Sequence, residues 1–318
     1  MKPTDVGRLL RLSLAPTAAA DAVAGIALAS AGVGPFPARG AWLVASSLCV
    51  YHGALAWNDW NDRDHDARTR PGRPLPSGAV TPLVAAGLGA ALVLGGVACA
   101  AFVSWLAAAW MAGVAALALL YDFAGRGPWL GPLLIACCRA GNLACAIVAL
   151  PLASGTTPLP VPIAVVPPLF YGAYVFLTSR LGRMEDAEDA APLGQRPRTL
   201  LIGIALVPVL SVAAFAASLA STGAPSWSRS APGLAAAAVL AGVGMWSVAA
   251  TALRTPAWTR AQVERAMGAC LRRLLIVTAI AASLSTTLHG GAAGGVAAAA
   301  ILCGYPIAHA LRRVFPPS

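Results

Sequence analysis

The stretch WNDWNDRDHDARTRPGRPLPSG, residues 57–78, decides how the rest of this sequence is interpreted. It crowds four aspartates and four arginines between two long apolar runs: Asp59, Asp62, Asp64, Asp66, Arg63, Arg68, Arg70 and Arg73. On a helix, which turns about 100° per residue, four side chains that carry oxygen atoms share one face: Asn58, Asp59, Asp62 and Asp66. Asp64 points away from that face.

Carboxylates on one helix face repel each other unless a cation lies among them. Hard oxygen ligands suit Mg²⁺, which keeps several waters and binds through one or two carboxylates plus substrate phosphates. The alternative is a solvated loop between two membrane helices, where charge is expected without any function. The spacing of the acids and a second acidic cluster downstream favour a functional site.

Composition indicates an integral membrane protein. Of 318 residues, 58% are hydrophobic and 11% are charged, and the mean hydropathy is +0.73. A soluble domain carries about 25% charged residues. The net charge of +10 does not indicate nucleic-acid binding, because the arginines lie in short loops between apolar segments. The seven cysteines lie in predicted spans and form no CxxC or Cys/His metal spacing.

We predict one all-α domain over residues 1–318, a multi-pass helical bundle of nine to ten membrane spans. A span needs about 20 apolar residues. Such runs predict spans near 15–33, 39–57, 79–97, 101–121, 129–152, 161–181, 199–221, 232–253, 266–288 and 292–311. Thr81-Pro82 and Thr255-Pro256 are predicted helix N-caps followed by proline, and the second places an interfacial helix before the ninth span.

The basic residues predict the orientation. With the N-terminus in the cytoplasm, 19 of the 22 basic residues face inward, Arg39 and Arg229 face outward, and Arg139 lies within a span. This pattern predicts a bacterial inner-membrane protein whose charged motif faces the cytoplasm. The sequence leaves the oligomeric state open.

A second acidic cluster ends the sixth predicted span, just as the first ends the second. Residues 180–189 contain Glu185, Asp186, Glu188 and Asp189. Four spans separate the clusters, so both face the same side. A charge costs about 2.5–3.5 kcal/mol at a bilayer centre, so these acids belong at the mouth of a water-accessible cavity. Two acidic faces at one end of a bundle can hold two Mg²⁺ ions around one diphosphate; alternatively, residues 183–198 form a solvated loop of mixed charge.

NDWNDRDHD matches the pattern NDxxDxxxD and is followed by RPLPSG. This combination, at 58–78, resembles the UbiA superfamily of membrane prenyltransferases, and ExxxD at Glu185 and Asp189 resembles its second, DxxxD-type motif. The altered second motif and the Arg139 segment resemble the UbiA-like EboC branch. The resemblance implies a UbiA-like helical fold, usually of nine spans, and transfer of an isoprenyl group from a prenyl diphosphate to an acceptor that is usually aromatic.

The resemblance also implies roles for individual residues. Metal ligands are expected at Asn58, Asp59, Asp62, Asp66, Glu185 and Asp189. Arg11 resembles the family's basic residue near the first span. Many members have Tyr-x-x-x-Lys after span four; this chain has Tyr121 and Gly125, so Arg126 is the candidate for the basic role.

Chemistry adds further candidates. Arg68, Arg70 and Arg73 are expected to bind diphosphate oxygens through forked, charge-assisted hydrogen bonds. Trp57, Trp60 and Tyr174 are candidates to stabilise an allylic cation by cation–π contact, or are aromatic belt residues. Catalytic roles are expected for Asp62, Asp66, Arg126 and Arg139, and substrate contacts for Arg11, Asn58, Tyr121 and Asn142.

Arg139 has two interpretations. An ionisable residue near mid-membrane is a functional candidate by default, and Asn142 lies on a similar helix face. A structural ion pair with Asp21 of the first span is the alternative. His52, one to two turns from the first motif, is a candidate for contact with the acceptor.

Three functions therefore remain open from sequence. The first is a Mg²⁺-dependent prenyltransferase that acts on a prenyl diphosphate and a lipophilic or aromatic acceptor. The second is a UbiA-type membrane terpene cyclase, in which the cation reacts internally. The third is a non-catalytic or transport protein for an anionic lipid or metabolite, although such a carrier is expected to place its acids at mid-membrane.

Overall fold

The computed structural model describes residues 1–30, 38–125, 127–184, 193–223 and 227–316, which form helices and no strand. In chain order the elements are α1 (Pro3–Leu9), the 3₁₀ turn η1 (Leu12–Leu14), α2 (Ala15–Ala29), α3 (Ala38–Thr69), α4 (Pro82–Ala101), α5 (Trp105–Phe123), α6 (Leu130–Ser154), α7 (Val161–Gly182), α8 (Arg196–Ser221), α9 (Trp227–Arg254), α10 (Arg260–Arg272), α11 (Leu274–His289), α12 (Ala293–Leu302) and α13 (Gly304–Val314).

Nine stretches of the described chain are helical, long and apolar enough to cross a membrane. They comprise η1–α2, α4, α5, α6, α7, α8, α9 from Arg229, α10–α11 and α12–α13. The 32-residue α3 contains the second predicted span, 39–57, in its first half; polar residues such as Ser46, Ser47 and His52 lower its hydropathy. Each of the ten predicted spans therefore corresponds to a helix or to a pair of consecutive helices, and the all-helical multi-pass bundle is confirmed.

Helix starts follow local capping chemistry. The Thr81 side chain accepts a hydrogen bond from the Val84 amide, and Pro82 begins α4, as predicted. The second predicted cap is wrong: α10 begins after Thr259, not Thr255. Thr259 and Gln262 form a capping box, which satisfies two backbone N–H groups reciprocally and thus outcompetes a single threonine cap.

Small residues let the helices approach closely. A Cβ atom at Gly25 of α2 would lie 2.1 Å from the Leu143 carbonyl oxygen of α6. A Cβ atom at Gly89 of α4 would lie 1.8 Å from the Trp57 ring of α3. In lipid, where burial between helices gains little hydrophobic energy, such close backbone contact is a main source of helix association.

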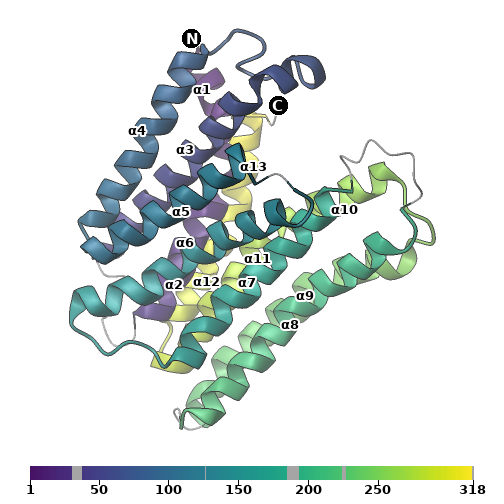
Figure 1. Ribbon diagram of the computed structural model, residues 1–318. Coiled ribbons are helices and arrows are strands. Elements are labelled where there is room, and N and C mark those ends of the chain that lie inside the picture. Colours follow the sequence, from purple (N-terminus) through teal and green to yellow (C-terminus); the bar gives the residue numbers. More distant parts are fainter. Residues whose placement is uncertain (31–37, 126, 185–192, 224–226, 317–318) are drawn as a thin grey trace.

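Helix α2 is central, because it packs against α3, α6, α11, α12 and α13. The long pair α8–α9 lies at the outside of the bundle, and both chain ends lie at its upper end in Figure 1. There α13 contacts η1 and α2, and a Cβ at Gly7 would lie 2.2 Å from the Phe315 ring. The last two helices thus close over the N-terminal segment.

Candidate functional site

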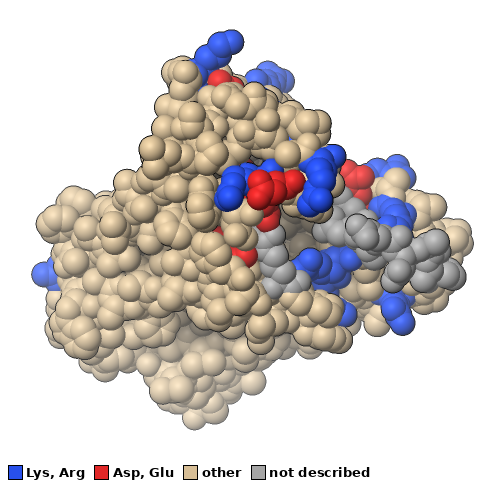
Figure 2. All heavy atoms as spheres, turned by 45° about the horizontal axis from the view of Figure 1, so that its top comes forward, with Lys and Arg blue, Asp and Glu red and all other residues tan. Residues whose placement is uncertain are grey.

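The charged residues gather at one end of the bundle. Figure 2, which brings the upper end of Figure 1 forward, shows blue and red side chains around the centre of this face and toward the top and right of the view, whereas the left and lower parts carry almost no charged side chain. The second half of α3 supplies the first acidic motif to this end, because α3 continues as one helix to Thr69. The motif is therefore a helical extension of the span and not a loop.

Two aspartates of α3 and two arginines form a compact group that we call the quartet: Arg11, Asp59, Asp66 and Arg73. Three of the four are buried, and the Arg11 side chain is 29% exposed. Arg11 donates to Asp59 Oδ1 at 2.6 Å, and Arg73 donates to Asp66 Oδ2 at 2.5 Å. Arg73 Nη1 also lies 3.6 Å from Asp59 Oδ1. Both aspartates are 2% exposed. The two charges of each sign cancel, so the quartet is neutral as a unit.

The backbone at Arg11 is unusual. Its φ of 49° lies in the left-handed region, and among the described residues other than glycine it is the one with positive φ. Such a conformation costs a side-chain-bearing residue on the order of 1–2 kcal/mol. The turn between α1 and η1 thereby directs the Arg11 side chain back onto α3, 48 residues away in sequence. Strain of this kind is commonly retained at functional sites.

Two polar atoms of the quartet are buried without a hydrogen-bond partner, Asp59 Oδ2 and Arg73 Nε. Burial raises the pKa of the Asp59 carboxyl above its ordinary value, and the charges of Arg11 and Arg73 oppose that rise. Buried polar atoms are rarely left unpaired in proteins, so these two are expected to find partners in a bound ligand.

These residues suit a metal that arrives with its substrate. In the described chain, no three His, Cys, Asp or Glu side chains are grouped to hold a metal ion by themselves. Mg²⁺ commonly takes one or two protein carboxylates and completes its shell with phosphate oxygens and water. The unpaired Asp59 Oδ2 and the half-exposed Asp62 can supply such ligands. The described residues therefore fit a Mg²⁺ ion that shares its coordination shell with phosphate oxygens.

Two asparagines of the motif contact Asp122, a residue that the sequence did not single out. The Asn58 amide donates to Asp122 Oδ1 at 2.8 Å, and Asn61 donates to the Asp122 backbone carbonyl at 2.7 Å. Asp122 lies at the end of α5 and is 4% exposed. It ties α5 to the motif helix. The sequence could have pointed to Asp122 because acids are rare in this chain and few of the 12 fall outside the two clusters.

A central cavity of about 300 Å³ lies beside the quartet. Polar side chains line it at Arg11, Asn58, Asp122, Arg139, Thr178 and Ser179. The rest of the lining is apolar or aromatic and comes from α3, α5, α6, α7 and the α10–α11 segment: Tyr51, Ala54, Leu55, Ala118, Tyr121, Ile135, Cys138, Val175, Leu271 and Leu274. The cavity is thus polar beside the motif and at Arg139, and most of its wall is apolar. This suits a ligand with an anionic head and a hydrocarbon tail.

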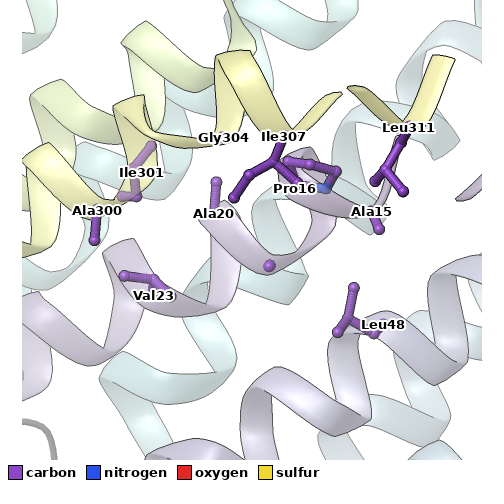
Figure 3. Close-up of a pocket in the computed structure, with 11 residues that line it drawn as sticks. Ala15, Pro16, Ala20, Val23, Leu48, Ala300, Ile301, Gly304, Ile307 and Leu311 are labelled. Atoms are coloured by element: carbon purple, nitrogen blue, oxygen red, sulfur yellow. The ribbon is translucent and has the colours of Figure 1, made fainter. Parts of the chain in front are cut away.

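An apolar groove of about 270 Å³ runs along α2 on another side. In Figure 3, Pro16 and Ala20 of α2 face Gly304 and Ile307 of α13, and Leu48 of α3 lies across from them. The groove is lined without a charged residue, so it offers only contact with hydrocarbon.

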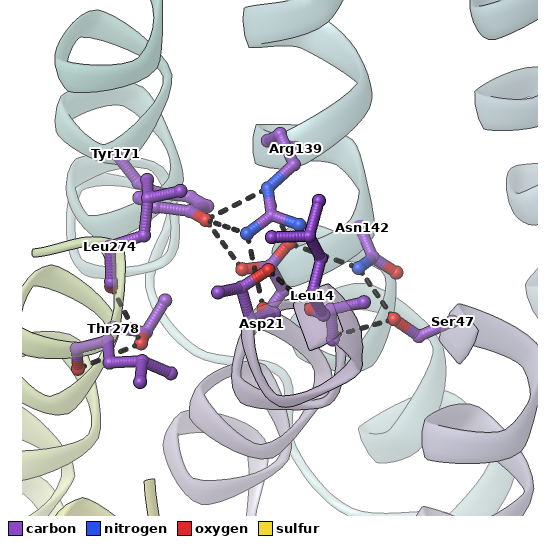
Figure 4. A network of polar contacts seen from close by, with 11 residues as sticks. Leu14, Asp21, Ser47, Arg139, Asn142, Tyr171, Leu274 and Thr278 are labelled. Atoms are coloured by element: carbon purple, nitrogen blue, oxygen red, sulfur yellow. Dashed lines mark hydrogen bonds and ion pairs between the residues drawn. The ribbon is translucent and has the colours of Figure 1, made fainter. Parts of the chain in front are cut away.

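A buried polar network crosses the bundle deeper in the membrane (Figure 4). Arg139 Nε lies 3.1 Å from Asp21 Oδ2, and the Tyr171 hydroxyl donates to Asp21 Oδ1 at 2.6 Å. Asn142 donates to Asp21 at 3.2 Å and to the Ser47 hydroxyl at 2.7 Å. The predicted pairing of Arg139 with Asp21 is confirmed. Arg139 also lines the central cavity, and its Nη1 is buried without a partner.

The remaining candidates fall into three groups. Arg68 and Arg70 are exposed and line none of the cavities described here. Asp62 is half-exposed on the motif face, beside the buried pair. Arg126, Glu185 and Asp189 lie outside the described residues, as do Asp186 and Glu188. The helix that precedes the second motif, α7, nevertheless ends at the site, since Thr178 and Ser179 line the central cavity.

Three of the predicted aromatic candidates are engaged elsewhere. Tyr174 donates to the Cys270 carbonyl at 2.8 Å, and Trp57 donates to the Ala86 carbonyl at 3.1 Å. Trp60 packs with Leu75 and its neighbours beneath the motif. Tyr51 and Tyr121 line the cavity instead. The candidate His52 is also engaged, with its Nδ1 2.6 Å from the Leu10 carbonyl oxygen.

Comparison with known proteins places this geometry in a family. The model of the UbiA prenyltransferase family matches residues 15–264. Protoheme IX farnesyltransferase from Anaeromyxobacter sp. (strain Fw109-5) is 46% identical over 67 residues. That alignment covers 20% of this chain and 22% of the relative, so the chain matches about a fifth of the relative's length.

Solved structures share the fold over most of their length. A structure of digeranylgeranylglyceryl phosphate synthase aligns with a TM-score of 0.62 at 17% identity, covering 89% of this chain and 98% of that one. A UbiA homologue from Archaeoglobus fulgidus, bound to GPP and Mg²⁺, aligns with a TM-score of 0.56 at 14% identity, covering 87% and 99%. At these identities the likeness establishes the fold.

Proposed function

Because the chain belongs to the UbiA prenyltransferase family, we propose that it transfers an isoprenyl group from a prenyl diphosphate to a lipophilic, typically aromatic acceptor, with Mg²⁺ as cofactor. One observation carries the proposal: a largely buried quartet of two aspartates and two arginines adjoins a mostly apolar cavity and shares Arg11 with it. The quartet matches a diphosphate, and the cavity matches an isoprenyl chain.

In this scheme the metal ligands come from the motif face of α3 and from the second acidic cluster, which follows α7 in the sequence and lies outside the described residues. Asp59, Asp62 and Asp66, with Asn58 beside them, would hold one Mg²⁺ ion together with diphosphate oxygens, and Glu185 and Asp189 would hold a second. The A. fulgidus homologue, which carries GPP and Mg²⁺, supports this ligand pair for the shared fold. Exposed Arg68 and Arg70 attract the anionic substrate to the motif end, since summed positive charge steers association.

The quartet supplies a specific chemical step. Without ligand, each guanidinium neutralises a carboxylate. An arriving diphosphate offers Arg11 and Arg73 new anionic oxygens, and the released carboxylates can then ligate metal. Each arginine thus has an anionic partner both before and after the diphosphate binds. No unpaired charge is buried at any stage, so its desolvation cost is avoided.

Transfer then breaks the bond between C1 of the isoprenyl group and the diphosphate oxygen, and the electron pair leaves with the diphosphate. Mg²⁺ supplies Lewis-acid stabilisation of that leaving group when bound. The Tyr51 and Tyr121 rings flank the central cavity and can stabilise the allylic cation by about 0.5–2 kcal/mol. The cation forms its new bond with the acceptor, which loses a proton to the released diphosphate or to water. Arg126 and Arg139 remain candidates to position the acceptor.

The chain is a multi-pass membrane protein by its family and its apolar helices. We place the motif end at the cytoplasmic face of a bacterial inner membrane, because the positive-inside rule applied to the arginine-rich loops favours that orientation. This places the quartet where water-soluble Mg²⁺ reaches it.

The test compares two aspartates of one helix. Asp62 lies on the motif face, whereas Asp64 points into solvent with 85% of its side chain exposed. Purified protein is titrated with geranyl diphosphate in Mg²⁺ or in EDTA, and diphosphate release is then measured with a panel of aromatic acceptors. Asp62→Asn is expected to abolish Mg²⁺-dependent binding and release, and Asp64→Asn to retain both.

Equal binding and turnover in the two variants would overturn the scheme. Product analysis without an acceptor tests the cyclase alternative, because a cyclase yields a cyclised hydrocarbon under those conditions.

A further inference from the structure

A second and larger cavity of about 580 Å³ adjoins the central cavity, and we call it the basic chamber. It lies among the N-terminal segment, α10, α11 and α13. No described Asp or Glu lines it, whereas five arginines and a histidine do: Arg8, Arg11, Arg73, Arg272, Arg312 and His309. Arg11 and Arg73 are neutralised by the aspartates of the quartet, so the unbalanced positive charge comes from Arg8, Arg272 and Arg312. Like charges around one hollow repel each other unless an anion lies among them.

Several of these arginines have hydrogen-bonding capacity to spare. Arg8 donates from Nη2 to the Gly72 carbonyl at 3.0 Å, but its Nε is buried without a partner. Arg73 is 8% exposed, and its Nε is likewise unpaired. Among the described carboxylates, none lies within 4.0 Å of Arg8, Arg272 or Arg312. The chamber therefore presents donors and positive charge that the described protein does not neutralise.

Helix α13 builds one wall of this chamber through its amphipathic pattern. Gly304, Ile307 and Leu311 face the apolar groove along α2 in Figure 3. The other face, with His309 and Arg312, lines the chamber. Residues at spacings of three and four share a helix face, so one short helix separates a hydrocarbon surface from a cationic one. Both α13 and Arg272 lie beyond residues 15–264, which the family model matches.

The chamber lies next to the central cavity, because Arg11, Tyr51, Leu271 and Leu274 line both hollows. A molecule whose anionic group lies near Arg272 and Arg312 would therefore have its other end close to the wall, including Tyr51, that the chamber shares with the central cavity. The apolar part of the chamber wall, which includes Leu14, Leu275 and Phe315, suits an amphiphile better than a small hydrophilic ion.

We propose that the basic chamber binds the anionic group, a carboxylate or a phosphate, of an amphiphilic acceptor and thereby presents the acceptor's nucleophilic atom to the central cavity. The acceptor role rests on the proposed prenyl transfer; the anion site itself does not. Arg272 and Arg312 are specificity residues in this proposal, because they are exposed, lack described acidic partners and lie away from the metal motif.

The test measures binding without metal and without prenyl diphosphate. Full-length protein in a neutral detergent with EDTA is titrated with oleoyl lysophosphatidic acid, with monoolein, which lacks the charge, and with inorganic phosphate. Arg272→Gln and Arg312→Gln are compared with Arg313→Gln, which removes the neighbouring exposed arginine of α13 that does not line the chamber. Binding of geranyl diphosphate with Mg²⁺ is measured in parallel.

Saturable binding of lysophosphatidic acid is expected, weakened about tenfold or more by Arg272→Gln or Arg312→Gln, as loss of a charge-assisted hydrogen bond implies. Arg313→Gln should bind like the unmodified protein, and monoolein should bind far more weakly. Inorganic phosphate with the same sensitivity to Arg312 would show that a free anion suffices; its failure to bind would assign the site to an amphiphile's head group.

Equal affinity in the Arg312→Gln and Arg313→Gln variants, or equal binding of monoolein, would overturn the proposal. So would an equal loss of geranyl diphosphate binding in Arg312→Gln, because the chamber would then belong to the diphosphate site. Asp62→Asn should keep the lysophosphatidic acid affinity, so failure of the proposed transferase function and failure of this anion site give different results.

Discussion

Removal of Arg73 separates the contribution of the quartet to stability from its proposed role in binding metal and diphosphate. In Arg73→Met an uncharged, unbranched side chain replaces the guanidinium that donates to Asp66 at 2.5 Å and lies 3.6 Å from Asp59. Asp66, 2% exposed, loses its charged partner, and Asp59 keeps only Arg11. Without ligand the variant should be less stable than the unmodified protein. Added Mg²⁺ should stabilise the variant more than it stabilises the unmodified protein, because the arginine that competes with the metal for the carboxylates is gone.

The magnitudes follow from burial. Breaking a buried ion pair by removing one partner costs about 3–5 kcal/mol, since an uncompensated charge stays inside. If the metal dissociation constant falls tenfold, saturating Mg²⁺ adds about 1.4 kcal/mol more stabilisation than it gives the unmodified protein. The same variant should bind geranyl diphosphate more weakly, because Arg73 is proposed to move onto the diphosphate.

The assay is thermal unfolding in neutral detergent, followed with and without Mg²⁺ and with Mg²⁺ plus geranyl diphosphate. Arg63→Met is the matched control: Arg63 lies on α3, the helix that carries the motif aspartates, 3.8 Å from exposed Asp64, in a pair expected to contribute about 0–1 kcal/mol. An Mg²⁺-induced shift that is identical in Arg73→Met and in the unmodified protein would refute the exchange of partners.

Three further outcomes are expected. Arg139→Leu should lower stability by about 3–5 kcal/mol, and adding Asp21→Leu should restore most of that loss, because an apolar pair leaves no buried charge; thermal unfolding of both variants checks this. Asp122→Asn should lower the apparent Mg²⁺ affinity, measured from the Mg²⁺ concentration that half-saturates diphosphate release, by about 10–100-fold. Asp122 is a hydrogen-bond partner of the proposed ligand Asn58, and loss of such partners has effects of this size at metal sites. Gly25→Val should destabilise the bundle, since its Cβ would lie 2.1 Å from a backbone oxygen of α6; melting temperature and expression level report it.

Much of the fold was predictable because one physical constraint dominates. Membrane-spanning segments must satisfy their backbone hydrogen bonds internally, so long apolar runs become helices. Eight of the ten predicted runs correspond to one helix each, and the last two correspond to the pairs α10–α11 and α12–α13. Most ends differ by a few residues, but α3 continues twelve residues past the predicted end of its span. The first motif was predictable because the membrane-spanning segments avoid charge, so a cluster of acids stands out against them.

The partners of those acids were not predictable from spacing. Arg11 reaches Asp59 through a left-handed turn, and Arg73 reaches Asp66 after α3 has ended and the chain has turned. Such contacts depend on tertiary geometry that no helical periodicity encodes. Asp122 was missed because it is a single acid at the end of an apolar helix. The roles of Glu185 and Asp189 stay predictions, because those residues lie outside the described chain.

The two buried polar groups differ in a way that indicates their roles. In the deep network, both oxygens of Asp21 have partners, from Arg139, Tyr171 and Asn142. In the quartet, Asp59 has one oxygen that is buried and unpaired, although an arginine lies on the other. Unpaired buried atoms cost about 1–3 kcal/mol each, so a fold tolerates them where a ligand completes the set. Arg139 Nη1 of the deep network is also buried without a partner, and Arg139 lines the central cavity. We therefore propose that the deep network fixes helix packing through Asp21 and keeps one donor for a ligand, whereas the quartet keeps a carboxylate oxygen for one.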